Sequence, residues 1–93
     1  MKKEEGNMDK DFYIEICNKK KNLSEYNGSE ADVIIPESVE EIGEEAFGWN
    51  DILETIVIPQ GVKKIGERTF ILCESLKIVQ LPKSLKTISA YAF

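Results

Sequence analysis

Five glutamates between residues 37 and 45 are the side chains best placed for acid–base chemistry, because paired carboxylates can serve as acid and base. The sequence contains no histidine, which excludes Ser-His-Asp triads, imidazole catalysis and histidine metal sites. The equivalent positions 23 residues later also carry charges, of mixed sign, so we favour a solvated surface over an active site. The five residues are Glu37, Glu40, Glu41, Glu44 and Glu45.

The two cysteines, Cys17 and Cys73, form no CxxC motif and are too few for a disulfide scaffold. We expect two free thiols, because the residues belong to segments that an intervening repeat should separate. Asn50 lies 23 residues before Cys73, and both side chains are expected to contact loop backbone. Glycines occur singly and Asn50-Asp51 is too poor in carboxylates for calcium. The sequence therefore predicts no catalytic, cofactor-binding or metal-binding residues.

The composition limits both the size and the partners of the protein. Ninety-three residues with 42% apolar content make one small domain with a single core. Twelve basic and seventeen acidic residues give a net charge of −5 without a basic face, so we expect no nucleic-acid partner. The apolar runs are only a few residues long, so we expect no membrane insertion.

A repeat positions these residues. Pro36, Pro59 and Pro82 are each 23 residues apart, and the residues around them repeat as well. A fixed period of this length is typical of a solenoid, in which stacked units share one core. The aligned units are VIIPESVEEIGEEAF (33–47), IVIPQGVKKIGERTF (56–70) and VQLPKSLKTISAYAF (79–93).

Each repeat predicts one strand, because apolar residues occupy the first, fourth and sixth places before each proline, and proline then ends the strand. A second apolar pair should return the chain across the back of the coil, and Gly43 and Gly66 should permit a tight bend. A short helical turn should then bury Phe47, Phe70 and Phe93 as a stack of rings. The inward positions are Leu53, Ile56, Ile58, Leu76, Val79 and Leu81, and the second pairs are Val39/Ile42, Val62/Ile65 and Leu85/Ile88.

The segment before the repeats is expected to contain two parts. Residues 1–10 are charged and aperiodic, which indicates a disordered tail. Residues 11–29 alternate apolar and polar side chains from Phe12 and end near Asn27-Gly28, which predicts an amino-terminal hairpin that caps the solenoid of residues 30–93.

At residues 26–93 the chain resembles the BspA-like leucine-rich repeats, whose pattern is LxxΦxΦPxxΦxxIGxxAFxxC. Units such as LETIVIPQGVKKIGERTF carry the resemblance, with Thr69 in place of the alanine and Ser89 in place of the glycine. The resemblance implies a β-rich, right-handed leucine-rich-repeat coil, and a bacterial adhesin or interaction scaffold that is secreted or on the cell surface. The first residues lack the apolar stretch of a signal peptide, so we expect a cytoplasmic protein if Met1 is the natural start, and otherwise a piece of an exported one.

Strand alternation predicts where a partner would bind. If Leu53, Ile56 and Ile58 point inward, two columns point outward. We interpret these columns as a protein-binding or surface-binding site, because exposed apolar patches commonly mark interaction sites. The alternative is that β-branched residues there merely favour the strand. The columns are Asp32/Thr55/Ile78 and Ile34/Val57/Gln80.

The preferred function is thus a non-catalytic interaction module. Two alternatives are a structural capping fragment of a longer repeat array and, less favoured, a small enzyme. The third unit stops at Phe93 without a following strand, so we also expect a homodimer through this carboxyl-terminal edge. Charges in register, such as Glu41 with Lys64 and Glu45 with Arg68, either pair between coils or form an ordinary solvated face.

Overall fold

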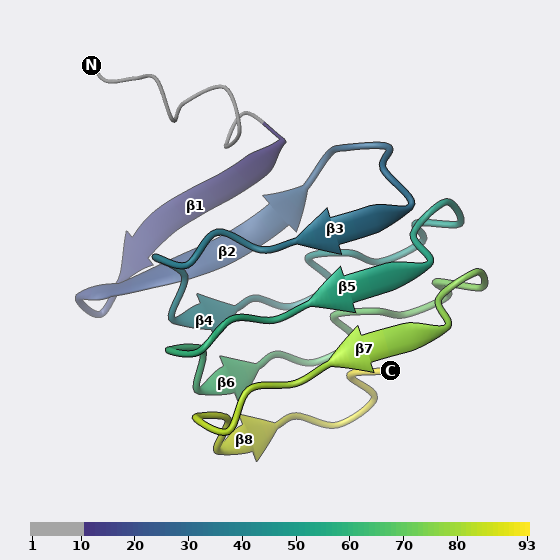
Figure 1. Ribbon diagram of the computed structural model, residues 1–93. Helices are drawn as coiled ribbons and strands as arrows, with labels where there is room; N and C mark the ends of the chain where they lie inside the picture. The colour runs from purple at the N-terminus through teal and green to yellow at the C-terminus, as the bar shows by residue number, and fades with distance from the viewer. Residues whose placement is uncertain (1–10) are drawn as a thin grey trace.

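The computed structural model describes residues 11–93 as eight strands in two sheets, with no helix among these residues (Figure 1). The expected tail, residues 1–10, lies outside the described residues. The strands are β1 (Phe12–Cys17), β2 (Lys20–Tyr26), β3 (Asp32–Ile34), β4 (Glu41–Ile42), β5 (Thr55–Val57), β6 (Lys64–Ile65), β7 (Ile78–Gln80) and β8 (Thr87–Ile88).

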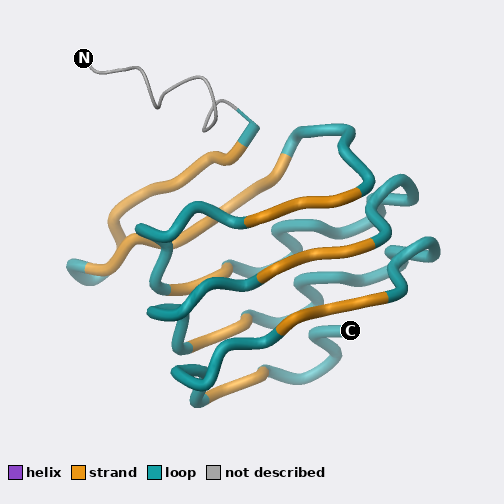
Figure 2. The backbone as a smooth tube through the Cα atoms, viewed as in Figure 1, coloured by secondary structure: helices purple, strands orange, loops and turns teal. Residues whose placement is uncertain are grey.

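The repeats form three stacked coils, which we call coil 1 (30–52), coil 2 (53–75) and coil 3 (76–93). One sheet has the order β3-β5-β7, and the opposite sheet has the order β1-β2-β4-β6-β8. All pairs between coils are parallel and join residues 23 apart, such as Ile56 with Val79 (Figure 2). Each coil therefore has two strands where the sequence indicated one. The second strand forms because the N–H of Lys63 and Gly66 reach the carbonyls of Glu40 and Ile42, at 3.0 and 2.8 Å.

The expected helical turn in each repeat is wrong. Residues 44–49 and 67–72 form consecutive turns instead. Glu45 and Trp49 have positive φ angles of 57° and 61°, which a right-handed helix does not allow. Their N–H groups donate to the carbonyls of Glu67 (3.1 Å) and Ile71 (2.7 Å) in coil 2. The turns therefore serve as a third ladder between coils, because inter-coil bonds replace the bonds of a helix.

The conserved spacing of Gly43 and Gly66 reflects close stacking rather than the expected bend. A Cβ atom on Gly66 would lie 2.9 Å from the Gly43 carbonyl carbon and from the Ile42 oxygen. Of the described glycines, Gly61 is the one with a positive φ. Neighbouring Thr69 is fully buried, and its Oγ1 lies 2.8 and 3.0 Å from the carbonyls of Gly66 and Gly43, so the hydroxyl has an acceptor inside the core.

The stack of aromatic rings is confirmed and is longer than the repeats predicted. The rings of Phe47, Phe70 and Phe93 follow one another at centroid distances of 5.3 and 5.1 Å. Tyr26 and then Phe12 extend the stack, each with a centroid distance of 5.0 Å. These distances match the spacing of adjacent strands, about 4.8 Å, because each coil supplies one ring at the same position.

The predicted inward positions are buried in the first two coils. Leu53, Ile56 and Ile58 are at most 2% exposed, whereas Leu81 of coil 3 is 46% exposed. Coil 3 differs because no further coil covers it within the described residues.

The first two strands form an antiparallel hairpin with an irregularity between Tyr13 and Ile14. The second strand, β2, also pairs in parallel with β4 of coil 1, where Leu23 lies opposite Ile42. Leu23 is fully buried, and Ile16 near the hairpin turn is exposed. That the hairpin serves as a cap remains a prediction.

We predict that Phe70→Ala reduces the free energy of unfolding by about 3–5 kcal/mol, because it removes a buried ring from the middle of the stack. Phe93→Ala is the matched control, since its ring has one stacking neighbour and is 57% exposed. Urea unfolding followed by circular dichroism measures both. Equal losses would mean that the stack does not carry the stability.

Candidate functional site

The two outward columns lie side by side on the β3-β5-β7 sheet. Its register pairs Asp32 with Thr55 and Thr55 with Ile78. The second column consists of Ile34, Val57 and Gln80, paired in the same way. One sheet face therefore brings together all six residues that the sequence singled out.

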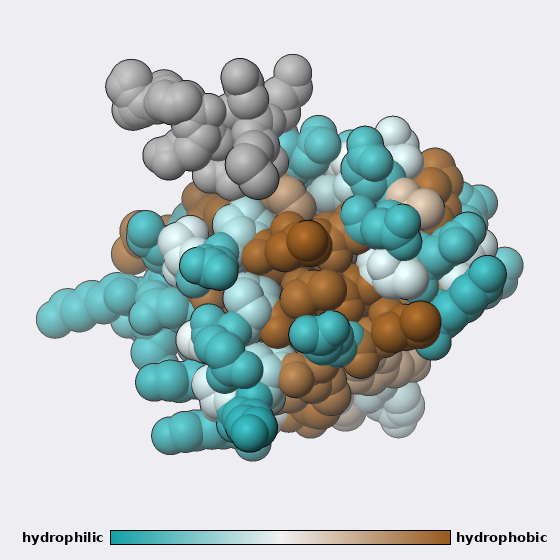
Figure 3. All heavy atoms as spheres, viewed as in Figure 1, coloured by the Kyte–Doolittle hydropathy of each residue, from teal (hydrophilic) through white to brown (hydrophobic). Residues whose placement is uncertain are grey.

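This face has an exposed apolar centre. Ile34 is 71% exposed and Ile78 is 61% exposed, while Val57 between their strands is half-buried. Apolar side chains gather over β3, β5 and β7 in the space-filling view (Figure 3). Thr55 Oγ1 donates a hydrogen bond of 2.8 Å to Asp32 Oδ1, which fixes one polar pair beside the apolar residues. We call this surface, made of the six column residues, the sheet face.

A cavity of about 390 Å³ adjoins the sheet face at its β3 edge. Two column residues, Asp32 and Ile34, contribute to its walls. Burial raises the pKa of the Tyr26 hydroxyl at this cavity, and its oxygen accepts a hydrogen bond of 3.4 Å from the Glu30 N–H. The sequence gave no sign of this cavity, because it depends on how the hairpin packs against coil 1. Its walls are formed by Asp11, Phe12, Tyr26, Glu30, Asp32, Val33 and Ile34.

The glutamates of coil 1 lie away from the sheet face and are engaged with the hairpin. Glu40 Oε1 accepts a hydrogen bond of 2.9 Å from the Lys21 N–H. Glu41 lies 3.8 Å from the Lys20 Nζ. Within residues 11–93, no three His, Cys, Asp or Glu side chains come together as metal ligands. The geometry thus gives these carboxylates a role in surface contacts.

The charge pairs between coils differ from those expected from the register. Arg68 lies 4.0 Å from Glu44 and 3.4 Å from Glu67, so it pairs diagonally rather than with Glu45. Glu41 pairs with Lys20 rather than Lys64, because β2 also borders coil 1. The Arg68 guanidinium also lies over the ring of Tyr91, 5.8 Å from its centroid. These contacts are exposed, and each contributes at most about 1 kcal/mol.

Both cysteines are free. Cys17 is exposed, whereas Cys73 is half-buried and its Sγ donates to the Phe47 carbonyl at 3.0 Å. Asn50, at the equivalent place in coil 1, accepts hydrogen bonds from the N–H groups of Ile52 (2.9 Å) and Leu53 (3.0 Å). Burial raises the pKa of the Cys73 thiol, which disfavours the reactive thiolate. Both side chains therefore hold loop backbone, as the sequence indicated.

No helix within residues 11–93 has the length and apolar character needed to cross a membrane.

Residues 14–93 match the family described as a BspA type leucine rich repeat region (6 copies). The chain belongs to this family. Its repeat pattern and its coiled fold are therefore those of a BspA-type leucine-rich-repeat protein. No curated protein is significantly similar to the chain in sequence.

Solved structures of bacterial leucine-rich-repeat proteins have the same fold. The T. pallidum leucine-rich-repeat protein superposes with a TM-score of 0.82 at 26% identity, over 85% of this chain and 40% of its own length. A leucine-rich-repeat protein from Bacteroides capillosus ATCC 29799 gives 0.82 at 28% identity, over 89% of this chain and 70% of its own. A leucine-rich cell surface protein from Faecalibacterium prausnitzii A2-165 gives 0.76 at 24% identity, over 84% of this chain and 24% of its own. The chain thus spans less than half of two of these proteins.

We predict that a thiol reagent at pH 8 labels the folded chain rapidly at Cys17 and slowly at Cys73, because only Cys17 is exposed. Mass spectrometry counts one fast label on the native protein and two after denaturation. Fast labelling of Cys73 in the Cys17→Ser variant would show that the thiol leaves the Phe47 carbonyl readily.

Proposed function

We propose that this chain is a non-catalytic interaction module that binds a protein or surface ligand through the sheet face. The observation that carries the proposal is the exposure of Ile34 and Ile78, 71% and 61%, on the sheet whose register aligns them with Val57. Contiguous apolar side chains on a flat sheet are favoured by burial against a partner. The family and the structural neighbours, all leucine-rich-repeat proteins, support an interaction role at this coarser level.

An adhesin-like activity is the more specific form of this proposal. The short strands hold the column residues on a rigid ladder, so binding would require little ordering of the surface. The partner would present an apolar strip flanked by polar groups, since Asp32, Thr55 and Gln80 border the apolar residues.

A second candidate is a segment of a longer repeat array with a structural role. Its support is that the chain aligns with 40% of the T. pallidum protein and 24% of the Faecalibacterium prausnitzii protein. In that case the sheet face would extend over further coils.

We predict that Val57→Lys weakens binding at least about tenfold, since burying one aliphatic side chain contributes about 1.5–3 kcal/mol. The assay immobilises the chain, captures ligands from a panel of purified matrix proteins and surface glycoproteins, and measures each affinity by surface plasmon resonance. Val57 is half-buried but points outward, so the melting temperature should change little.

Ile16→Lys is the matched control, because Ile16 is an exposed strand residue on the hairpin and far from the columns in the fold. A ligand that Ile16→Lys loses as strongly as Val57→Lys does would place binding elsewhere. A chain that captures nothing from the panel, while a longer array does, would favour the structural candidate.

A further inference from the structure

The carboxyl-terminal end of the solenoid presents backbone groups of coil 3 without partners among residues 11–93. The carbonyls of Glu40 and Ile42 in coil 1 accept N–H groups from coil 2, and those of Lys63 and Ile65 in coil 2 accept N–H groups from coil 3. At the equivalent places in coil 3 the carbonyls of Lys86 and Ile88 accept none of the described N–H groups. Both β7 and β8 are edge strands of their sheets. Open edges of this kind can pair with an added strand.

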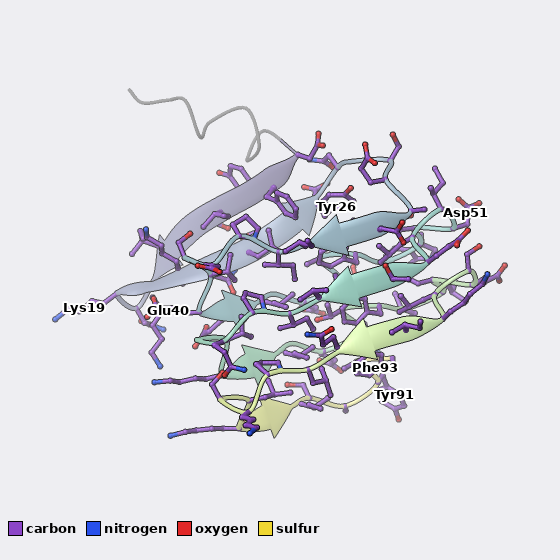
Figure 4. The ribbon with its side chains drawn as sticks, viewed as in Figure 1. Lys19, Tyr26, Glu40, Asp51, Tyr91 and Phe93 are labelled. Carbon is purple, nitrogen blue, oxygen red and sulfur yellow. The ribbon has the colours of Figure 1, made fainter. Side chains whose placement is uncertain are left out.

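Apolar side chains lie beside these open edges. Leu81, Ile88 and Phe93 are 46%, 47% and 57% exposed, whereas their equivalents in coil 2 are at most 3% exposed. Figure 4 shows Tyr91 and Phe93 together at this end of the molecule. We call this surface the terminal face; it consists of the β7 and β8 edges with Leu81, Leu85, Ile88, Tyr91 and Phe93.

The charge of the coils changes sign along the solenoid. Residues 30–52 carry eight acidic side chains and no basic one, and residues 53–75 carry three of each. Residues 76–93 carry three lysines and no acidic side chain. The lysines Lys77, Lys83 and Lys86 therefore surround an apolar surface without local countercharges in their own coil. One of them, Lys77, already pairs with Glu54 of coil 2 at 3.8 Å, which shows that one coil can supply the countercharge for its neighbour.

The opposite end of the molecule shows how a non-repeat strand closes a coil. There, β2 lies against coil 1, with its Tyr26 ring 5.0 Å from the Phe47 ring. Backbone bonds join Tyr26 N–H to the Ala46 carbonyl (2.9 Å) and Gly43 N–H to the Leu23 carbonyl (2.7 Å). The basic start of this strand meets the acidic coil, where Lys20 pairs with Glu41. Closure thus combines a strand, an aromatic ring and opposite charge.

We propose that the terminal face binds an acidic β-strand of a separate polypeptide, which pairs with the β8 edge and stacks an aromatic ring on Phe93. The same three contacts close the amino-terminal end, with the charges reversed. This strand would donate N–H groups to the Lys86 and Ile88 carbonyls and place carboxylates near Lys83 and Lys86.

A second copy of the chain fits this face less well. Two terminal faces meeting about a two-fold axis would bring their lysines together without any acidic side chain from either third coil. A head-to-tail contact is also obstructed, because the hairpin strands β1 and β2 cover the β4 side of coil 1. Charge and topology therefore both favour a foreign acidic strand over self-association.

The test uses two synthetic peptides as probes for the full chain. The acidic probe is residues 32–47, which carry six acidic side chains, the strand pattern of the repeat and Phe47. The control probe is residues 55–70, which have the same apolar pattern, with three basic side chains and one acidic. Placed as a further coil, the acidic probe would put Glu37 beside Lys83 and Glu40 beside Lys86. Isothermal titration at low and high salt measures both affinities, and light scattering measures the mass of the chain alone.

We expect the acidic probe to bind a monomeric chain more tightly than the control probe does, and high salt to weaken this binding. In the Lys83→Glu/Lys86→Glu variant its affinity should fall about tenfold or more, since two attractions become repulsions. The matched variant Lys63→Glu/Lys64→Glu makes the same charge change in coil 2 and should lose less than about threefold. Both variants keep the same terminal carboxylate.

Three results would overturn the proposal. One is equal binding, or no binding, of the two probes. A second is an equal loss in both charge variants, which would reflect net charge alone. A third is a dimeric mass for the chain by itself that the Lys83→Glu/Lys86→Glu change leaves intact, which would assign the terminal face to a second copy. The sheet-face variant Val57→Lys should bind the acidic probe as the wild type does, so this test is independent of the proposed function.

Discussion

The backbone hydrogen bonds between adjacent coils are the constraint on which the rest of this structure depends. They join residues 23 apart in both sheets and also in the turns, where Phe47 donates to Thr69 (2.9 Å) and Phe70 to Ala92 (2.8 Å). A buried backbone group without a partner is costly, so a sequence that repeats every 23 residues has one favourable register. This register brings equivalent side chains into columns, which is why the aromatic rings follow one another at 5.0–5.3 Å.

The same columns generate the surfaces. Because side chains alternate along a strand, every inward column has an outward neighbour, and the sheet face is the counterpart of the core formed by Val33, Ile56 and Val79. The core residues can vary little, since the packed column leaves no free space. The outward residues are free to differ between repeats, so binding specificity can arise there without a change of fold.

The two ends of the solenoid differ in how these ladders stop. At the amino-terminal end, β2 extends the ladder of coil 1 and places Tyr26 and Phe12 on the ring stack. At the other end, Phe93 and Ile88 remain exposed beside strands with one open edge. Since the core of a repeat protein is shared between neighbours, coil 3 buries less of its apolar surface than coil 2 although its pattern is equivalent.

The repeat sequence by itself determined the period, the inward residues of each coil, the stacking of three phenylalanines and the membership of the two outward columns. These follow from local rules: proline ends a strand, side chains alternate, and equivalent positions align. The second strand of each coil, the replacement of a helical turn by inter-coil bonds at Glu45 and Trp49, and the close approach at Gly66 were decided only by the tertiary structure. The cavity beside β3 and the pairing of Glu41 with Lys20 also depend on how the hairpin packs. The reason is physical: each of these features involves a partner from another coil or from the hairpin, and only stacking brings that partner within reach.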